Sequence, residues 1–269
     1  MDDVSERVGV ARTLLGQARQ VVVLTGAGIS TDSGVPDFRG PNGVWTKNPE
    51  AERAATLEHY LSDPAVRRRA WQNRLDSNMG AARPNAGHRA LVDLERSGRL
   101  HTLVTQNVDG LHQKAGTDPS LMIEIHGSAL DIVCLRCGHV QPSAPVHERV
   151  RAGDLDPACL QTAPAGEPCG GILKSTTILF GQSLVAEDLE RAERAAQSCD
   201  LLLAVGSTLG VYPAAGLVPI ARRHGAGVII VNGGPTELDF AADVVVNGSI
   251  SEILPVLVGA STPHDMRHE

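Results

Sequence analysis

The chain has 269 residues, a net charge of −7, and 42% hydrophobic and 20% charged residues. This composition is typical of one large α/β domain or a domain with an insert, and it excludes a mainly disordered chain. Only 3% of the residues are aromatic. Together with the negative charge, this argues against nucleic-acid binding through phosphates or aromatic stacking.

Two stretches of sequence bear on the cellular location of the protein. Met1-Asp2-Asp3 is acidic, whereas a signal peptide begins with basic residues, so we expect a cytoplasmic protein. The uncharged stretch from Leu201 to Ala221 is long enough to span a bilayer, but glycines, prolines and hydroxyl residues interrupt it. We interpret it as a buried strand, a loop and an apolar helix, and expect no membrane partner.

Apolar periodicity predicts alternating strands and helices after an amphipathic helix over residues 4–18. Each predicted strand stops at Gly, Asn, Gln, His, Ser or Thr, and the last helix begins with Ser249 and Glu252 at capping-box spacing. The pattern predicts an α/β fold with a Rossmann-like parallel sheet, helices on both faces and a shared ligand crevice at the strand ends. The predicted strands are 21–25, 103–105, 121–125, 201–205 and 228–231, and the predicted helices are 86–96, 186–197, 213–223 and 249–258.

Two stretches interrupt this alternation. Residues 41–85 contain no strand-like run, and residues 129–176 are rich in Cys, Pro and Gly. We predict that they form a smaller lobe, made of a helical insert and a zinc-ribbon insert. The Rossmann-like domain would then comprise 1–40, 86–128 and 177–260, with 261–269 as a flexible tail.

Four of the five cysteines cluster in the second insert. Cys134 and Cys137 form a CxxC knuckle, and Cys159 and Cys169 follow. Four thiolates suit a tetrahedral structural zinc, which stabilises the fold and leaves no open position for chemistry. The nine residues between Cys159 and Cys169 make Cys159 the least typical ligand. A redox CxxC is the alternative, but that motif sits at a helix start beside a strand.

A glycine-rich turn follows the first strand at Gly26-Ala27-Gly28. Such glycines let a backbone approach a pyrophosphate at the start of a helix. The full G-x-G-x-x-G fingerprint is absent because residue 31 is Thr. An ordinary strand-to-helix turn therefore stays an equal alternative.

The next predicted strand ends in the polar residues Gln106, Asn107 and Asp109. Their amide and carboxylate groups could hydrogen-bond a ribose, an amide or a water molecule. By spacing alone, a helix cap at Asn107 or Asp109 is the better interpretation.

His126 ends a strand and faces the expected crevice, where it could act as a general base near neutral pH. A lone histidine is more often structural. Six other histidines lack a comparable setting in the sequence: His59, His88, His101, His112, His139 and His147.

Pro36-Asp37-Phe38-Arg39-Gly40 has an unusual composition for a plain turn. Such a loop could close over a ligand, with the aromatic ring excluding water and the guanidinium meeting phosphate.

Taken together, these motifs resemble the sirtuins, the NAD-dependent protein-lysine deacylases. The resemblance is collinear and covers about residues 10–258. The motifs that carry it are Gly26–Ser30, Pro36–Gly40, Thr105–Asp109, His126-Gly127, the four clustered cysteines, Cys169-Gly170-Gly171, Phe180-Gly181, Gly206–Leu209 and Val231-Asn232.

The resemblance implies a function and a set of site residues. NAD would be the co-substrate, with His126 as the base acting on its ribose hydroxyls, and the products would be lysine, nicotinamide and O-acyl-ADP-ribose. An acyl-lysine peptide would bind as an added strand near Phe180-Gly181 and Val211-Tyr212. Asn107 and Asp109 would assist catalysis. NAD would be bound by Gly26, Ala27, Gly28, Asp37, Phe38, Arg39, Gln106, Asn107, Asp109, Gly206, Ser207 and Asn232.

Departures from the family pattern bear on substrate choice. Gln182 stands where the family often has Glu, which removes a charge beside the peptide channel. Members that remove succinyl groups carry Tyr-x-x-Arg, and an ungapped count places Gln72 and Leu75 there, with Arg74 one residue away. We therefore expect acetyl or another neutral acyl group.

Three other functions remain as alternatives. A mono-ADP-ribosyltransferase would use the same NAD site. A non-catalytic NAD- or zinc-binding module would share the motifs without turnover. A hydride-transferring dehydrogenase fits poorly, because no Rossmann fingerprint with a ribose-binding acid is present.

Overall fold

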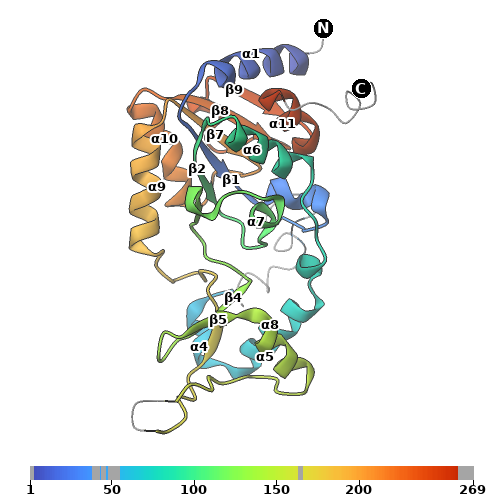
Figure 1. Ribbon diagram of the computed structural model, residues 1–269, viewed down its shortest axis with the longest axis vertical. Helices are drawn as coiled ribbons and strands as arrows, with labels where there is room; N and C mark the ends of the chain where they lie inside the picture. Colours follow the sequence, from blue (N-terminus) through green and yellow to red (C-terminus); the bar gives the residue numbers. More distant parts are fainter. Residues whose placement is uncertain (1–2, 38–42, 44–46, 48–54, 163–165, 260–269) are drawn as a thin grey trace.

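The protein consists of a large lobe built on a parallel sheet and a small lobe below it (Figure 1). The computed structural model describes residues 3–259 except 38–42, 44–46, 48–54 and 163–165. This arrangement confirms the predicted fold class.

The sheet of the large lobe has six strands in the order β3-β2-β1-β7-β8-β9, and every neighbouring pair is parallel. The chain winds outward from β1 in one direction, returns, and winds outward from β7 in the other. The topological switch point therefore lies between β1 and β7, where ligands of doubly wound folds bind. The strands are β1 Val21–Thr25, β2 Leu100–Thr105, β3 Met122–Glu124, β7 Leu201–Val205, β8 Gly227–Asn232 and β9 Val244–Asn247.

Strand β9 was not predicted from the sequence. Its run of three valines ends at Asn247-Gly248, which is the same signal that marked the other five strands. The run is short, and β9 lies at the edge of the sheet beside β8.

Helices cover both faces of the sheet (Figure 1), as the uninterrupted apolar strands require. Val21 and Val23 of β1 pack with α1 (Asp3–Gln17), α6 (Ala86–Arg96) and α11 (Ile250–Val258). Val22 and Leu24 point to the opposite face, toward α9 (Ala186–Ser198) and α10 (Leu217–Arg223). Alternate residues of one strand thus belong to two separate cores.

Two details of the predicted helices are wrong. The helix predicted over 213–223 begins as a 3₁₀ turn, η4 (Ala214–Gly216), and becomes α-helical only at Leu217. Pro219 lies in the first turn of α10, where its missing N–H would have no partner within the helix. The predicted capping box at Ser249 does not form, because the Ser249 carbonyl already accepts the N–H groups of Glu252 and Ile253.

The two inserts form one small lobe with a shared core. Trp71 of α5 is fully buried against Ile132 of β4 and Val146 of α8. The Tyr60 hydroxyl also donates to the Leu173 carbonyl at 2.8 Å, which joins the helical insert to β6. The elements of this lobe are α4 Leu57–Ser62, α5 Pro64–Asp76, α8 Ser143–Arg151 and the antiparallel strands β4 Asp131–Cys134, β5 Val140–Pro142 and β6 Leu173–Ser175.

The remaining elements are short. They are η1 Ala27–Ser33, η2 Asn78–Gly80, α7 Leu111–Ala115, η3 Pro119–Leu121 and η5 Asp239–Ala241. In the part of the chain that the structure describes, no helix combines the length and the apolar character needed to cross a membrane. The uncharged stretch from Leu201 to Ala221 divides into β7, a loop, η4 and α10, as its interrupting glycines and prolines predict.

The loops after β1 and β7 touch backbone to backbone at the switch point. The Gly28 N–H donates to the Gly206 carbonyl at 2.8 Å. A Cβ added at Gly28 would lie 2.8 Å from the Gly206 Cα and 2.9 Å from its carbonyl oxygen, closer than any real Cβ contact. Glycine is therefore required by the contact between the two loops.

We expect Gly28→Ala to lower the free energy of unfolding by about 1–3 kcal/mol, because the added methyl group overpacks this contact. Gly9→Ala is the matched control, since Gly9 lies in α1 and a Cβ there meets nothing within 4 Å. That control should gain about 0.5–1 kcal/mol from helix propensity. Urea unfolding measures both, and equal stability of the two variants would contradict the close contact.

Candidate active site

The predicted phosphate-binding glycines lie at the switch point of the sheet. The Gly26 N–H donates to the Val205 carbonyl at 2.9 Å, and the Gly206 N–H donates to the Val231 carbonyl at 2.9 Å. The ends of β1, β7 and β8 are thereby tied together. The element that follows Gly26 is the seven-residue 3₁₀ helix η1, so the long helix N-terminus of a classical dinucleotide site is absent from this position.

Side chains from the next strand ends join this group. The Gln106 side-chain amide, at the end of β2, donates to the Ser207 hydroxyl at 3.0 Å. The Gln106 N–H donates to the Thr25 carbonyl at 2.9 Å. Asn232, at the end of β8, holds the following turn through Nδ2 and the Gly234 carbonyl at 2.8 Å. Residues far apart in the sequence therefore meet at one edge of the sheet.

His126 follows β3 at the same edge and is partly buried. Its Nδ1 lies 3.2 Å from the Gln106 carbonyl oxygen. Because a carbonyl oxygen can only accept, Nδ1 carries the proton and Nε2 presents its lone pair. Burial lowers the pKa of His126 below its usual 6.5, and the hydrogen bond to Gln106 only partly offsets this. The ring is therefore neutral near pH 7, as a general base requires.

The backbone at His126 also joins the two lobes. The His126 carbonyl accepts the Ile178 N–H at 2.8 Å, on the segment that leaves the small lobe. Gly127 has a positive φ of 71°, and a side chain there would collide with the Thr176 carbonyl. The candidate base thus sits where the large lobe contacts the segment returning from the zinc-ribbon insert.

Asn107 and Asp109 are buried and hydrogen-bonded to the loop after β1. Asn107 Nδ2 donates to the Gly26 carbonyl at 3.1 Å and to the Ser30 hydroxyl at 3.3 Å. The Ser30 hydroxyl donates to the Asp109 carboxylate at 2.7 Å, and the other carboxylate oxygen accepts the Leu111 N–H at the start of α7. The N-cap of α7 is Gly110, so neither Asn107 nor Asp109 is the predicted helix cap. Asp109, the residue before the N-cap, still holds the first N–H of the helix and also accepts from Ser30.

Three residues of this region were missed as site candidates. Ser30 lies fully buried between Asn107 and Asp109. His88 and His112 are also fully buried, with ring centroids 4.9 Å apart. The expectation that these two histidines lack a setting comparable to His126 is wrong. The available signal was their position in the first turns of helices that begin at this edge of the sheet.

Both histidines are neutral. Burial lowers the pKa of His88 to about 4 and that of His112 to about 3. His112 Nε2 lies 3.0 Å from the Thr25 hydroxyl, and His88 Nε2 lies 3.5 Å from the Ser30 hydroxyl. Together with their partners they form a buried polar network of Thr25, Ser30, His88, Thr105, Asn107, Asp109 and His112.

The predicted cofactor loop is only partly described. Asp37 is a described residue, whereas Phe38 and Arg39 lie outside the described residues. Their role in shielding the site stays a prediction.

The four clustered cysteines have the geometry of a zinc site. Their Sγ atoms all lie within 4.8 Å of one another. The Sγ distances are 3.7 Å from Cys134 to Cys169 and 3.8 Å from Cys137 to Cys159. Four sulfurs about 2.3 Å from a tetrahedral zinc stand about 3.8 Å apart. The donor set therefore fits structural zinc, with Cys159 included, while Cys199 is buried elsewhere in the large-lobe core.

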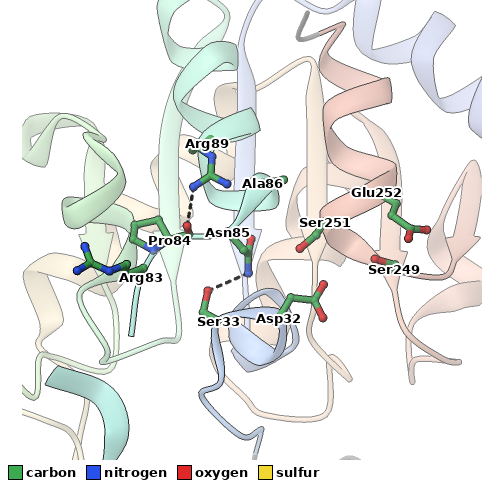
Figure 2. A pocket seen from close by; sticks show the side chains of 10 residues that line it. All are labelled: Asp32, Ser33, Arg83, Pro84, Asn85, Ala86, Arg89, Ser249, Ser251 and Glu252. Carbon is green, nitrogen blue, oxygen red and sulfur yellow. Dashed lines mark hydrogen bonds between the residues drawn. The ribbon is translucent and has the colours of Figure 1, made fainter. Parts of the chain in front are cut away.

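A separate pocket with a volume of about 660 Å³ lies between η1, α6 and α11 (Figure 2). Its charges are mixed, with Arg83 and Arg89 opposed by Asp32 and Glu252. None of the described residues predicted to bind NAD lines it. Figure 2 shows Asn85 reaching toward Ser33, and this hydrogen bond of 3.0 Å anchors η1 to the start of α6.

Fold and site define a doubly wound α/β protein with a polar ligand edge and a separate tetracysteine centre. The chain matches the Sir2 family over residues 26–213. It is 48% identical to NAD-dependent protein deacetylase 2 of Streptomyces coelicolor over 88% of this chain and 96% of that protein. The chain belongs to the Sir2 family.

Solved structures give the same result. A Sir2 structure with a deacetylated p53 peptide and 3′-O-acetyl ADP-ribose has a TM-score of 0.83 and 32% identity, over 94% of this chain and 97% of that one. A Sir2 structure with a p53 peptide and NAD⁺ has a TM-score of 0.79 and 33% identity, over 92% and 95%.

We expect the purified protein to contain about one zinc per chain, and Cys159→Ser to lose most of it, because three thiolates leave the tetrahedron open. Cys199→Ala is the control and should keep its zinc. Metal analysis by mass spectrometry measures all three proteins. Full retention of zinc by Cys159→Ser would remove Cys159 from the ligand set.

Proposed function

We propose that this protein is an NAD-dependent protein-lysine deacetylase that transfers the acyl group from lysine to ADP-ribose and releases nicotinamide. The observation that carries the proposal is the orientation of His126. In a Sir2-family chain, its neutral ring is fixed by the Gln106 carbonyl and presents Nε2 as a base at the edge of the sheet. An amide is a weak nucleophile, so such an enzyme needs an electrophilic partner and a shielded site.

The residues at this edge fit NAD by their donor set. We assign the phosphates and adenosine to the glycine-rich turns and strand ends on the β1, β7 and β8 side. The amides and carboxylate of the β2 end suit the nicotinamide and its ribose. The assigned residues are Gly26, Ala27, Gly28, Gly206, Ser207 and Asn232 for the first part, Gln106, Asn107 and Asp109 for the second, and Asp37, Phe38 and Arg39 for the covering loop.

NAD, when bound, supplies an anomeric carbon that the acyl oxygen can attack as nicotinamide leaves. The task of His126 is to accept a proton at Nε2 from a ribose hydroxyl. The Nδ1–H bond to Gln106 holds the ring in the orientation that this transfer needs. Asn107 and Asp109 orient the nicotinamide end. Both side chains are held in place by hydrogen bonds to the Ser30 hydroxyl.

The acyl-lysine peptide is proposed to add as a strand near Phe180-Gly181 and Val211-Tyr212. The Phe180 N–H donates to the Ala55 carbonyl, and the Phe180 carbonyl accepts the Leu57 N–H. A peptide would therefore pair with the opposite edge of this segment. At that edge the Gln182 side-chain oxygen already accepts the Leu179 N–H at 3.3 Å. Gln182 thus keeps an acceptor oxygen without the charge of a glutamate.

The small lobe supports a preference for neutral acyl groups. Leu75 packs against the small-lobe core, and the exposed Gln72 side chain donates to Asp76 at 2.9 Å. The Arg74 guanidinium hydrogen-bonds the Ser175 hydroxyl and lies over the Trp71 ring. Gln72 and Leu75, at the two positions of the Tyr-x-x-Arg motif, supply neither the hydroxyl nor the guanidinium that would hold an acidic acyl group. A cytoplasmic, reducing setting suits the thiolates of the zinc site.

An acetyl-lysine peptide incubated with the protein should lose its acetyl group only when NAD is present, with release of nicotinamide and O-acetyl-ADP-ribose. A succinyl-lysine peptide should react much more slowly. Mass spectrometry of peptide and nucleotide products measures both. Transfer of ADP-ribose to protein, without loss of acetyl, would identify a mono-ADP-ribosyltransferase instead.

The value of kcat/KM should rise with pH as His126 loses its proton. Because burial lowers the pKa of His126 below 6.5, the midpoint of this rise should lie below pH 6.5, with a plateau at pH 7–8. His126→Ala should lose about 10²–10⁴-fold in kcat together with the acidic limb. His224→Ala, at an exposed histidine, is the control. An unchanged pH profile in His126→Ala would show that another group is the base.

A further inference from the structure

We propose that His112 is a positioning residue that fixes Asn107, and with it the nicotinamide end of the site, through Thr25 and Thr105. The inference rests on the proposed function, because Asn107 is assigned to nicotinamide there. His112 itself belongs to α7, and its side chain hydrogen-bonds Thr25, which is not among the residues assigned to the phosphates or the adenosine.

The direction of each hydrogen bond in this chain follows from the donors available. The Thr25 hydroxyl donates its one hydrogen to the Thr105 hydroxyl at 2.9 Å. The contact of 3.0 Å between His112 Nε2 and the same Thr25 oxygen must therefore be donated by the histidine. The Thr105 oxygen also accepts the Asn107 N–H at 3.0 Å. A single ordered path of hydrogen bonds thus runs from His112 to the backbone of Asn107.

The other ring nitrogen shows that packing alone does not explain this histidine. His112 Nδ1 is buried and finds no hydrogen-bond partner among the described residues. Leaving a buried acceptor unpaired is unfavourable, and an apolar side chain of similar shape would avoid this cost. Burial and the neighbouring His88 ring hold the pKa of His112 at about 3, so it stays neutral and Nε2 remains a donor throughout the working pH range.

Asn107, at the end of this path, is hydrogen-bonded to two other parts of the site. Asn107 donates from Nδ2 to the Gly26 carbonyl and to the Ser30 hydroxyl. A shift of the Asn107 backbone would therefore move its side chain relative to the glycine-rich turn and loosen Ser30. We expect the effect to be larger at the nicotinamide end than at the adenosine end, which is assigned to Ser207 in the loop after β7 and Asn232 at the end of β8.

The test compares His112→Phe with His112→Gln. Phenylalanine keeps a ring but removes the donor, whereas the glutamine amide can donate to Thr25 from the place of Nε2. Calorimetry with NAD and with ADP-ribose, which lacks nicotinamide, gives a readout apart from turnover. We expect His112→Phe to weaken NAD binding about tenfold, which corresponds to one hydrogen bond. ADP-ribose, which keeps the ribose but lacks nicotinamide, should lose clearly less affinity than NAD. The KM for the peptide should not change, and His112→Gln should restore most of the NAD affinity.

A second variant tests the same path without touching the histidine. Thr25→Val removes the linking hydroxyl at nearly constant volume and should reproduce the selective loss of NAD affinity. Equal weakening of NAD and ADP-ribose, unchanged NAD binding in both His112→Phe and Thr25→Val, or failure of glutamine to restore it would overturn the inference. If the parent protein binds NAD but does not deacetylate, the proposed function fails while the binding comparison still tests the role of His112.

Discussion

The rest of the site depends on the close approach of two loops, after β1 and after β7, at the switch point of the sheet. Gly28 and Gly206 meet backbone to backbone, with no room for a Cβ between them. This contact joins the loops that follow β1 and β7, the two strands on either side of the switch point. It brings the end of β2, carrying Gln106, within hydrogen-bond distance of Ser207 on the far side of β1.

Behind this contact lies the buried polar network, which is costly to build and therefore specific. Each buried hydroxyl, amide or carboxylate needs partners in defined directions, so the members hold one another in a single arrangement. Most of the groups are satisfied, and His112 Nδ1 is a buried exception. His88 and His112 are neutral, so they add hydrogen-bonding groups to the network without adding buried positive charge. Rigid amide and carboxylate groups facing a ligand are an advantage in catalysis, because they need no reorganisation during the reaction.

The tetracysteine centre acts at a distance from this chemistry. Three of its residues, Cys134, Cys159 and Cys169, share a core with Trp71 and Ile132. These cysteines therefore join the helical insert to the antiparallel strands. The segment after β6 then returns to the large lobe and pairs with His126 through Ile178. Stability of the small lobe is thereby linked to the placement of the candidate base, although four thiolates leave zinc no open position for substrate.

The sequence by itself determined the layout of the protein, because strand and helix periodicity, strand-end residues and cysteine spacing are local signals. It predicted five of the six strands of the large sheet and the two inserts, and it identified the four cysteines, with Cys159 as the least typical. It predicted none of the three short strands of the small lobe. Only the tertiary structure decided which polar residues meet. Ser30, His88 and His112 lie on η1, α6 and α7, and nothing local in the sequence shows that the fold brings these three elements together. The same holds for Gly28 and Gly206, whose need for glycine comes from a contact between residues 178 positions apart in the chain.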